Sequence, residues 1–209
     1  GAQSCLGETN DHQPITTIES IMKNFILISA LFITTALLSV GSATAQHQTE
    51  TSRLENQELF FARIKSLCGS KFEGKSVFPE DPGDGFRDKL LVALVQTCSA
   101  DEIRIPFIVG EDHSRTWILK KTSEGLQFKH DHRHEDGTPD KITLYGGTAI
   151  GSGTQQAQSF PADDYTAKLI PEASSNEWFL SLSDDNNEMV YYLERHNKAR
   201  FKAILKRVP

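Results

Sequence analysis

Three histidines spaced two residues apart are the strongest candidates for chemistry in this sequence. His130, His132 and His134 lie in the stretch FKHDHRHEDGTPDK. Side chains two residues apart on a β-strand point to the same face, so a strand here would align the three imidazoles. Neutral imidazoles bind zinc, copper, nickel and iron, and the pattern therefore indicates a site for a divalent transition metal. No other cofactor follows from the sequence.

Strand geometry limits this metal-site interpretation. Neighbours on one strand face lie about 7 Å apart, because each residue rises about 3.3 Å, whereas zinc–nitrogen bonds are about 2.0 Å long. Two of these histidines together with a ligand from a neighbouring strand, such as His113, would satisfy the distances better. The alternative is a polar, pH-sensitive cluster at the end of a strand, and the sequence leaves both interpretations open.

Signatures of other chemistry are missing from the sequence. The patterns G-x-S-x-G, H-E-x-x-H, C-x-x-C and the P-loop do not occur. Asp112, His113 and Ser114 are adjacent, so their side chains diverge and cannot form a hydrogen-bonded triad. The sequence assigns no catalytic residue and favours a protein that binds a small ligand, a metal or an envelope component. The alternatives are a metal-dependent hydrolase using the four histidines and a structural interaction module.

An apolar segment near the N-terminus is typical of a secretory signal. Met22-Lys23 precede an apolar run over residues 25–40, and small residues then end in an A-x-A pattern at Ala45. The run is shorter than the roughly 20 apolar residues that a membrane span requires. We therefore expect an upstream extension outside the native structure, a signal peptide and a single β-rich domain, at residues 1–21, 22–45 and 46–209.

The charge limits the possible partners, and the cysteines fit an exported protein. The net charge is −6 for the whole chain, and residues 1–45 hold one lysine and three acidic residues, which leaves −4 from Gln46 onward. This acidic balance predicts no nucleic-acid partner, and we expect no membrane span after processing. Cys68 and Cys98 follow the cleavage point, and two cysteines in an exported domain are expected to form a disulfide. A reactive Cys68 is the weaker alternative.

One helix is predicted at the start of the domain, over residues 53–68. Ser52 and Glu55 match the capping-box pattern. Phe60, Ile64 and Leu67 then fall on one helical face. Gly69 is a typical residue just after a helix end.

After this helix the apolar period changes to two, which indicates strands. The predicted strands are DKLLVALVQTC, EIRIPFIVG, RTWILKKT, GLQFKHDHRH, KITLYGG, WFLSLS, EMVYYLER and RFKAILK. Asp136-Gly137 is a hairpin signal, and Pro106 indicates an edge strand or a bulge. The stretch PADDYTAKLIP is expected to hold one helical turn. Aromatic residues of the later strands, including Trp117, Trp178 and Tyr191, are interpreted as core.

Eight to ten short strands joined by short polar turns predict a mainly β fold. We expect an antiparallel up-and-down barrel of the lipocalin-like kind with one N-terminal helix, and a β-sandwich is the alternative. Pairing of the two strands that flank Glu124-Gly125 would place Arg115 opposite His132. The same pairing would bring His113 toward His134.

Two stretches, EIRIPFIVGEDHSRTWIL and LQFKHDHRHEDGTPDKITLYGG, resemble sequences from an uncharacterised family of exported, signal-peptide-bearing bacterial proteins. The resemblance covers most of residues 46–209. It implies a single domain in the periplasm or outside the cell. It implies no activity, ligand or residue role.

Overall fold

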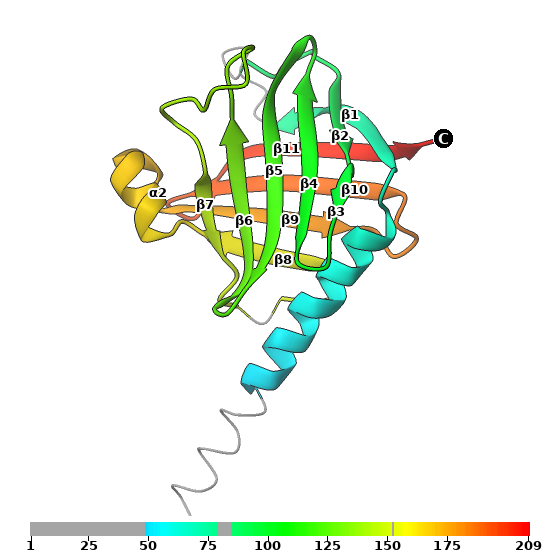
Figure 1. The fold of residues 1–209 in the computed structure, drawn as a ribbon, viewed down its shortest axis with the longest axis vertical. Helices are drawn as coiled ribbons and strands as arrows, with labels where there is room; N and C mark the ends of the chain where they lie inside the picture. The colour runs from blue at the N-terminus through cyan, green and yellow to red at the C-terminus, as the bar shows by residue number, and fades with distance from the viewer. Residues whose placement is uncertain (1–48, 79–84, 152) are drawn as a thin grey trace, which may run out of the picture. The chain divides into compact units, whose positions relative to one another are not determined.

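Antiparallel strands make up most of the chain that the computed structural model describes, which is residues 49–78, 85–151 and 153–209 (Figure 1). The strands are β1 (Lys71–Phe78), β2 (Leu91–Leu94), β3 (Thr97–Cys98), β4 (Glu102–Val109), β5 (Asp112–Thr122), β6 (Gly125–His132), β7 (Tyr145–Thr148), β8 (Ala157–Pro161), β9 (Asn176–Leu182), β10 (Glu188–Arg195) and β11 (Lys198–Val208). The expected upstream extension at 1–21 and signal peptide at 22–45 lie outside the described residues.

The strands form a nearly closed barrel. The sheet order is β7-β6-β5-β4-β2-β1-β11-β10-β9-β8, with β3 added beside β4. Most strands that are neighbours in sequence are neighbours in the sheet, and β1 also pairs with β11. In Figure 1, β4–β7 cross in front of β8–β11. The predicted up-and-down barrel is confirmed, and the β-sandwich alternative is wrong.

One seam, between β7 and β8, completes the circle with few backbone contacts. Gly147 of β7 forms an isolated bridge with Ala162, just after β8. The short helix α2 (Asp164–Leu169) follows directly, capped by Asp163, whose side chain accepts a hydrogen bond from the Thr166 N–H. The buried Thr166 hydroxyl accepts a hydrogen bond from the Gly146 N–H at 2.7 Å. Helix α2 is the helical turn predicted in PADDYTAKLIP, and its hydrogen bond to β7 stabilises the seam.

Alternation along the strands sends one set of side chains into the barrel. In β4, Ile103, Ile105, Phe107 and Val109 are all buried, as their spacing predicts. Pro106 is not on an edge strand, because β4 lies between β5 on one side and β2 and β3 on the other. On the second side, β2 pairs with β4 only as far as Phe107, and β3 pairs with β4 only at Ile103 and Arg104. The backbone pairing is therefore interrupted opposite Pro106. A residue without an N–H fits this interruption.

The N-terminal helix, described over residues 49–66, closes one end of the barrel. Gln57 donates to the Ala149 carbonyl and accepts from the Leu126 N–H. Arg63 donates to the Ser183 carbonyl, in the turn between β9 and β10. Phe60, Ile64 and Leu67 are buried, as predicted. No helix in the described part of the chain is long and apolar enough to cross a membrane.

The predicted start of this helix is wrong, whereas its end is close to the prediction. Ser52 lies inside the helix, because residues 49–51 are already helical, so it is not an N-cap. Glu50 and Arg53 form an ion pair one turn apart in this first described segment. The helix ends at residue 66, and Gly69 follows with a positive φ of 87°, which suits glycine.

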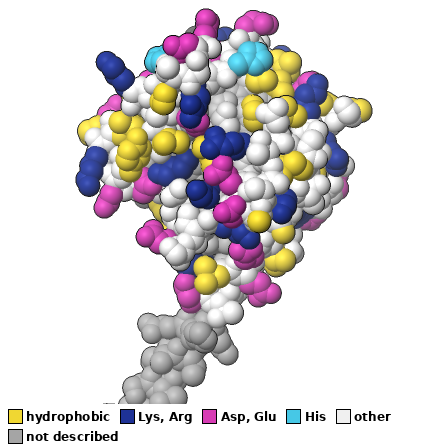
Figure 2. Space-filling model, in the orientation of Figure 1, with side chains coloured by type: hydrophobic (Ala, Val, Ile, Leu, Met, Phe, Trp, Pro, Cys, Tyr) yellow, Lys and Arg dark blue, Asp and Glu magenta, His cyan; other side chains and the backbone are white. Residues whose placement is uncertain are grey.

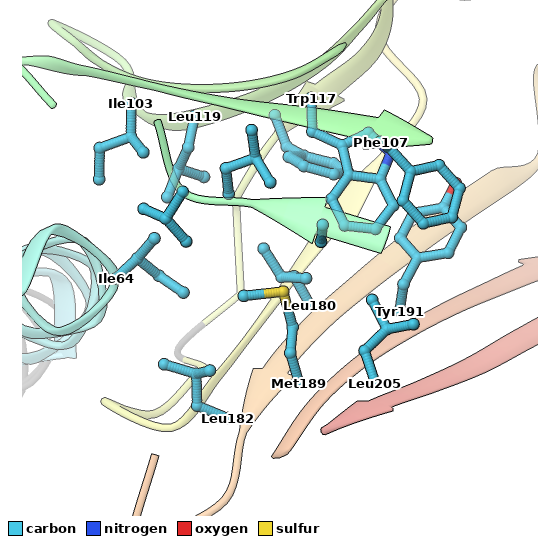
Figure 3. Packing of buried hydrophobic residues seen from close by; sticks show 14 of the residues in the cluster. Ile64, Ile103, Phe107, Trp117, Leu119, Leu180, Leu182, Met189, Tyr191 and Leu205 are labelled. Atoms are coloured by element: carbon cyan, nitrogen blue, oxygen red, sulfur yellow. The ribbon is translucent and has the colours of Figure 1, made fainter. Parts of the chain in front are cut away.

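The core lies between this helix and a layer of aromatic rings. Figure 3 shows Ile64 of the helix on one side of the cluster and the rings of Phe107, Trp117 and Tyr191 together on the other. Cys68 and Cys98 form a disulfide with their Cα atoms 6.2 Å apart, which confirms the predicted pairing. The bridge ties the end of the helix to β3.

Candidate functional site

A cavity of about 490 Å³ lies at the barrel end opposite the helix, which we call the open end. Its lining residues stand at the strand ends remote from the helix, such as Arg115 at the start of β5 and His132 at the end of β6. The segment between α2 and β9 covers part of the opening with Ile170 and Ala173, the latter in a 3-10 helix (Pro171–Ala173). The cavity combines an aromatic floor, a polar wall and a rim of arginines.

The floor of the cavity is a cluster of three aromatic rings from three different strands. Trp117 stacks with Phe107 and with Tyr191, with ring centroids 4.2 Å and 4.7 Å away and each pair within 19° of parallel, and the centroids of Phe107 and Tyr191 are 6.2 Å apart (Figure 3). All three residues are buried. They are core residues and also form the inner lining of the cavity.

His130 stands in the wall beside this stack with both ring nitrogens engaged. Its Nδ1 lies 3.2 Å from the Tyr145 carbonyl oxygen, and its Nε2 lies 2.9 Å from the Tyr191 hydroxyl. A carbonyl can only accept, so Nδ1 carries the proton and Nε2 accepts from Tyr191. Burial lowers the pKa of His130 from 6.5 to about 3. The imidazole is therefore neutral at physiological pH.

A second histidine–tyrosine pair adjoins the first. The Tyr145 ring stacks on His130 with centroids 4.7 Å apart, and its hydroxyl lies 3.0 Å from His132 Nε2. Burial raises the pKa of Tyr145 to about 12. Burial and the nearby Arg115 lower the pKa of His132. The wall is thus a band of hydrogen-bonded groups that are all uncharged near neutral pH.

Three arginines form the rim of the cavity, namely Arg115, Arg195 and Arg200. Arg115 is ion-paired with Asp112, and its guanidinium lies over the Phe86 ring at 5.4 Å. Arg195 donates from Nε to the Asn176 side-chain oxygen at 2.8 Å. Among the residues that the structure describes, no aspartate or glutamate lines this cavity.

A β-bulge explains the position of Arg200. Leu193 pairs with Phe201 and Glu194 pairs with Ala199, so Arg200 is an extra residue on β11 without a partner on β10. Simple alternation after the buried Phe201 would turn Arg200 outward. A bulge shifts that alternation and re-aims a side chain, which here brings Arg200 to the cavity.

The four histidines of the predicted metal site divide between two places. His130 and His132 line the cavity, whereas His113 and His134 line a separate surface depression beside Glu111. The predicted pairing of Arg115 with His132 is present. Strand β6 nevertheless ends at His132, so His134 lies beyond it, in the Asp136-Gly137 turn. Within the described residues, no three histidine, cysteine or acidic side chains are grouped to hold a metal ion.

The sequence did not predict two parts of the cavity lining, the tyrosines of the polar wall and the arginines of the rim. Tyr145 and Tyr191, which complete the polar wall, were not predicted to contact the histidines. Arg195 could have been found, because Met189, Tyr191, Leu193 and Arg195 follow the same period of two along β10.

Comparisons with known proteins supply no relative from which a function could be transferred. This chain matches no family model, no curated protein and no solved structure.

Proposed function

We propose that the barrel binds a small molecule with a flat aromatic or apolar body in the cavity at its open end. The observation that carries this proposal is a cavity of about 490 Å³ floored by the stacked rings of Phe107, Trp117 and Tyr191. Pockets for small ligands occupy about 300–1,000 Å³ and are mostly apolar, with a few converging polar groups. A planar ligand would gain stacking contacts and bury apolar surface against these rings.

The polar wall supports a role in orienting such a ligand. The Tyr191 hydroxyl donates a hydrogen bond to His130, and its oxygen can also accept a hydrogen bond from a ligand. Tyr145 and His132 share one hydrogen bond and are only partly enclosed by protein. These neutral groups would favour one orientation of the ligand without the cost of burying a charge.

The state of His130 favours binding over catalysis. A general base works best with a pKa near the working pH. Burial instead holds the pKa of His130 at about 3, and the lone pair on its Nε2 already accepts a hydrogen bond from the Tyr191 hydroxyl. The same engagement disfavours the metal-dependent hydrolase interpretation, since a metal ligand needs that electron pair.

We also infer that the protein works outside the cytoplasm, in the periplasm or secreted. The Cys68–Cys98 disulfide supports this location, because disulfides persist in oxidising compartments. The signal pattern at residues 22–45 points the same way.

A fluorescent probe tests the binding proposal directly. N-phenyl-1-naphthylamine (NPN) is a neutral, flat aromatic molecule whose emission rises in an apolar site. We expect NPN to bind the wild-type protein at one site. Leu193 lines the cavity, and the larger tryptophan side chain of the variant Leu193→Trp should fill part of it. This change should lower NPN affinity at least about tenfold, or about 1.4 kcal/mol.

The matched control places the same side chain on the other face of the same strand. Val190 alternates with Met189 and Tyr191, which are both buried, and so faces away from the cavity. Val190→Trp should bind NPN as the wild type does. Wild-type protein that does not bind NPN, or equal affinities in the two tryptophan variants, would contradict the proposed function.

A further inference from the structure

We propose that the ligand is an anion, with its aromatic body in the cavity and an oxyanion such as a carboxylate or sulfonate held at the rim by Arg195 and Arg200. This inference rests on the proposed function and names its ligand class. The charge of the rim, the free donors of Arg195 and the bulge at Arg200 support it.

In the described part of the chain, the charged side chains that line the cavity all have the same sign. Among the described residues they are three arginines, and only Arg115 has a carboxylate partner, Asp112. The carboxylate nearest in sequence to Arg195 is Glu194, which points to the other strand face and accepts a hydrogen bond from Tyr192 at 2.8 Å. Arg195 and Arg200 have no ion-pair partner in the described part of the chain, unlike Arg115.

The front of the barrel has a different charge pattern from the rim. Figure 2 shows lysine and arginine side chains interspersed with acidic ones over the front of the barrel. Arg104 of β4, for example, pairs with Glu102 at 2.7 Å and approaches Asp131 at 3.7 Å. The rim instead adds like charge, since the residue opposite Arg195 on β11 is Lys198. An anionic ligand would relieve this repulsion.

The geometry of Arg195 suits an oxyanion. Its Nε donates to Asn176, a buried residue, and this bond fixes the plane of the guanidinium. The two terminal nitrogens remain as a planar pair of donors, which matches the two oxygens of a carboxylate or sulfonate. Arg200 reaches the same cavity only because of the bulge in β11. Bulges of this kind are frequent next to binding sites, where they re-aim a side chain.

The aromatic floor and the arginine rim together define an amphiphilic ligand. A flat body would lie against Trp117 and Tyr191, which are buried, and its anion would face the solvent-accessible rim. The reverse orientation would place a charge beside the uncharged pair His130–Tyr191, where burial penalises it.

Two probes that differ by one anionic group provide the test. 8-Anilinonaphthalene-1-sulfonate (ANS) has the same two ring systems as NPN and adds a sulfonate. We expect the wild-type protein to bind ANS at least about tenfold more tightly than NPN at low ionic strength, and added salt to reduce this preference. NPN should displace ANS, and Leu193→Trp should weaken the binding of both.

The double variant Arg195→Gln/Arg200→Gln should remove the preference for ANS over NPN. The control Lys206→Gln/Arg207→Gln removes the same charge from two exposed residues near the other end of β11, and it should keep the wild-type preference. NPN binding by each variant shows that its cavity is folded.

The outcomes separate this inference from the proposed function. Equal affinity of the wild type for ANS and NPN, or an unchanged preference in the double arginine variant, overturns the anion inference and leaves a neutral binding site. ANS binding that NPN cannot displace also overturns it, because the anion then lies elsewhere. Failure of both probes to bind overturns the proposed function as well.

Discussion

The neutral state of His130 makes the stability of this barrel depend on pH. Burial lowers the pKa of this imidazole from 6.5 to about 3 in the folded protein. Between those two values the unfolded chain binds a proton that the folded chain does not, so the free energy of unfolding rises with pH. The stability is complete above pH 6.5 and is lost progressively as the pH falls toward 3.

The variant His130→Gln should remove most of this dependence. From pH 7 to pH 5 the wild type should lose about 2 kcal/mol more unfolding free energy than the variant, measured by urea denaturation at both values. His134→Gln serves as the control, because His134 is exposed in a turn and should leave the wild-type slope unchanged. Equal slopes in the wild type and His130→Gln would show that another group governs the effect.

The direction of the histidines could be predicted at this scale, but their partners could not. The period of two after Leu126 and Phe128 correctly predicted that His130 points into the barrel. Its hydrogen-bond partner Tyr191 is 61 residues away in another strand, and no local pattern links them. Arg200 was unpredictable for a related reason, since its bulge depends on the register of β11 against β10.

At the scale of elements, two strands escaped prediction because they carry few inward apolar side chains. Strand β1 buries only Phe72, and β8 buries Gln158 and Phe160. Their contribution is backbone pairing, which leaves little trace in hydropathy. Both strands are nevertheless needed to bring the sheet round to a barrel. Strands with several inward apolar side chains, such as β4, were predicted.

The seam between β7 and β8 depends on a residue without a side chain. A Cβ atom on Gly147 would lie 1.7 Å from the Pro161 carbonyl oxygen, so the two strands could no longer meet. Gly147→Ala should lower the free energy of unfolding by about 1–3 kcal/mol or more, measured by urea denaturation. Gly151→Ala is the matched control, since no atom lies within 4 Å of its added Cβ, and it should change stability by less than about 1 kcal/mol. Similar losses in both variants would argue against a tight seam.

At the scale of the whole molecule, the barrel could be predicted because its strands pair in chain order. Short polar turns join most of them, and each hairpin can be inferred from local sequence. The site could not be predicted in the same way. The helix pattern shows a buried face at Phe60 and Ile64, but it does not indicate which barrel end that face covers. The open end, and with it the cavity, follows only from the tertiary contacts of Gln57 and Arg63.

The pairing of β1 with β11 has a consequence for how the protein acquires its binding site. Most other strand pairs join segments close in sequence, whereas Lys71 of β1 lies opposite Val208 of β11. Bringing such distant segments together carries the largest loop-closure entropy, so hairpins should form first and this pair late. Because Arg200 and Phe201 of β11 line the cavity, a refolding chain should gain its ligand site only in this final step.

In stopped-flow refolding, NPN fluorescence should therefore rise in a slower phase than far-ultraviolet circular dichroism, and simultaneous phases would contradict this order. The capacity to bind would then mark chains that have finished folding, and ligand present during refolding would capture completed barrels without accelerating their formation.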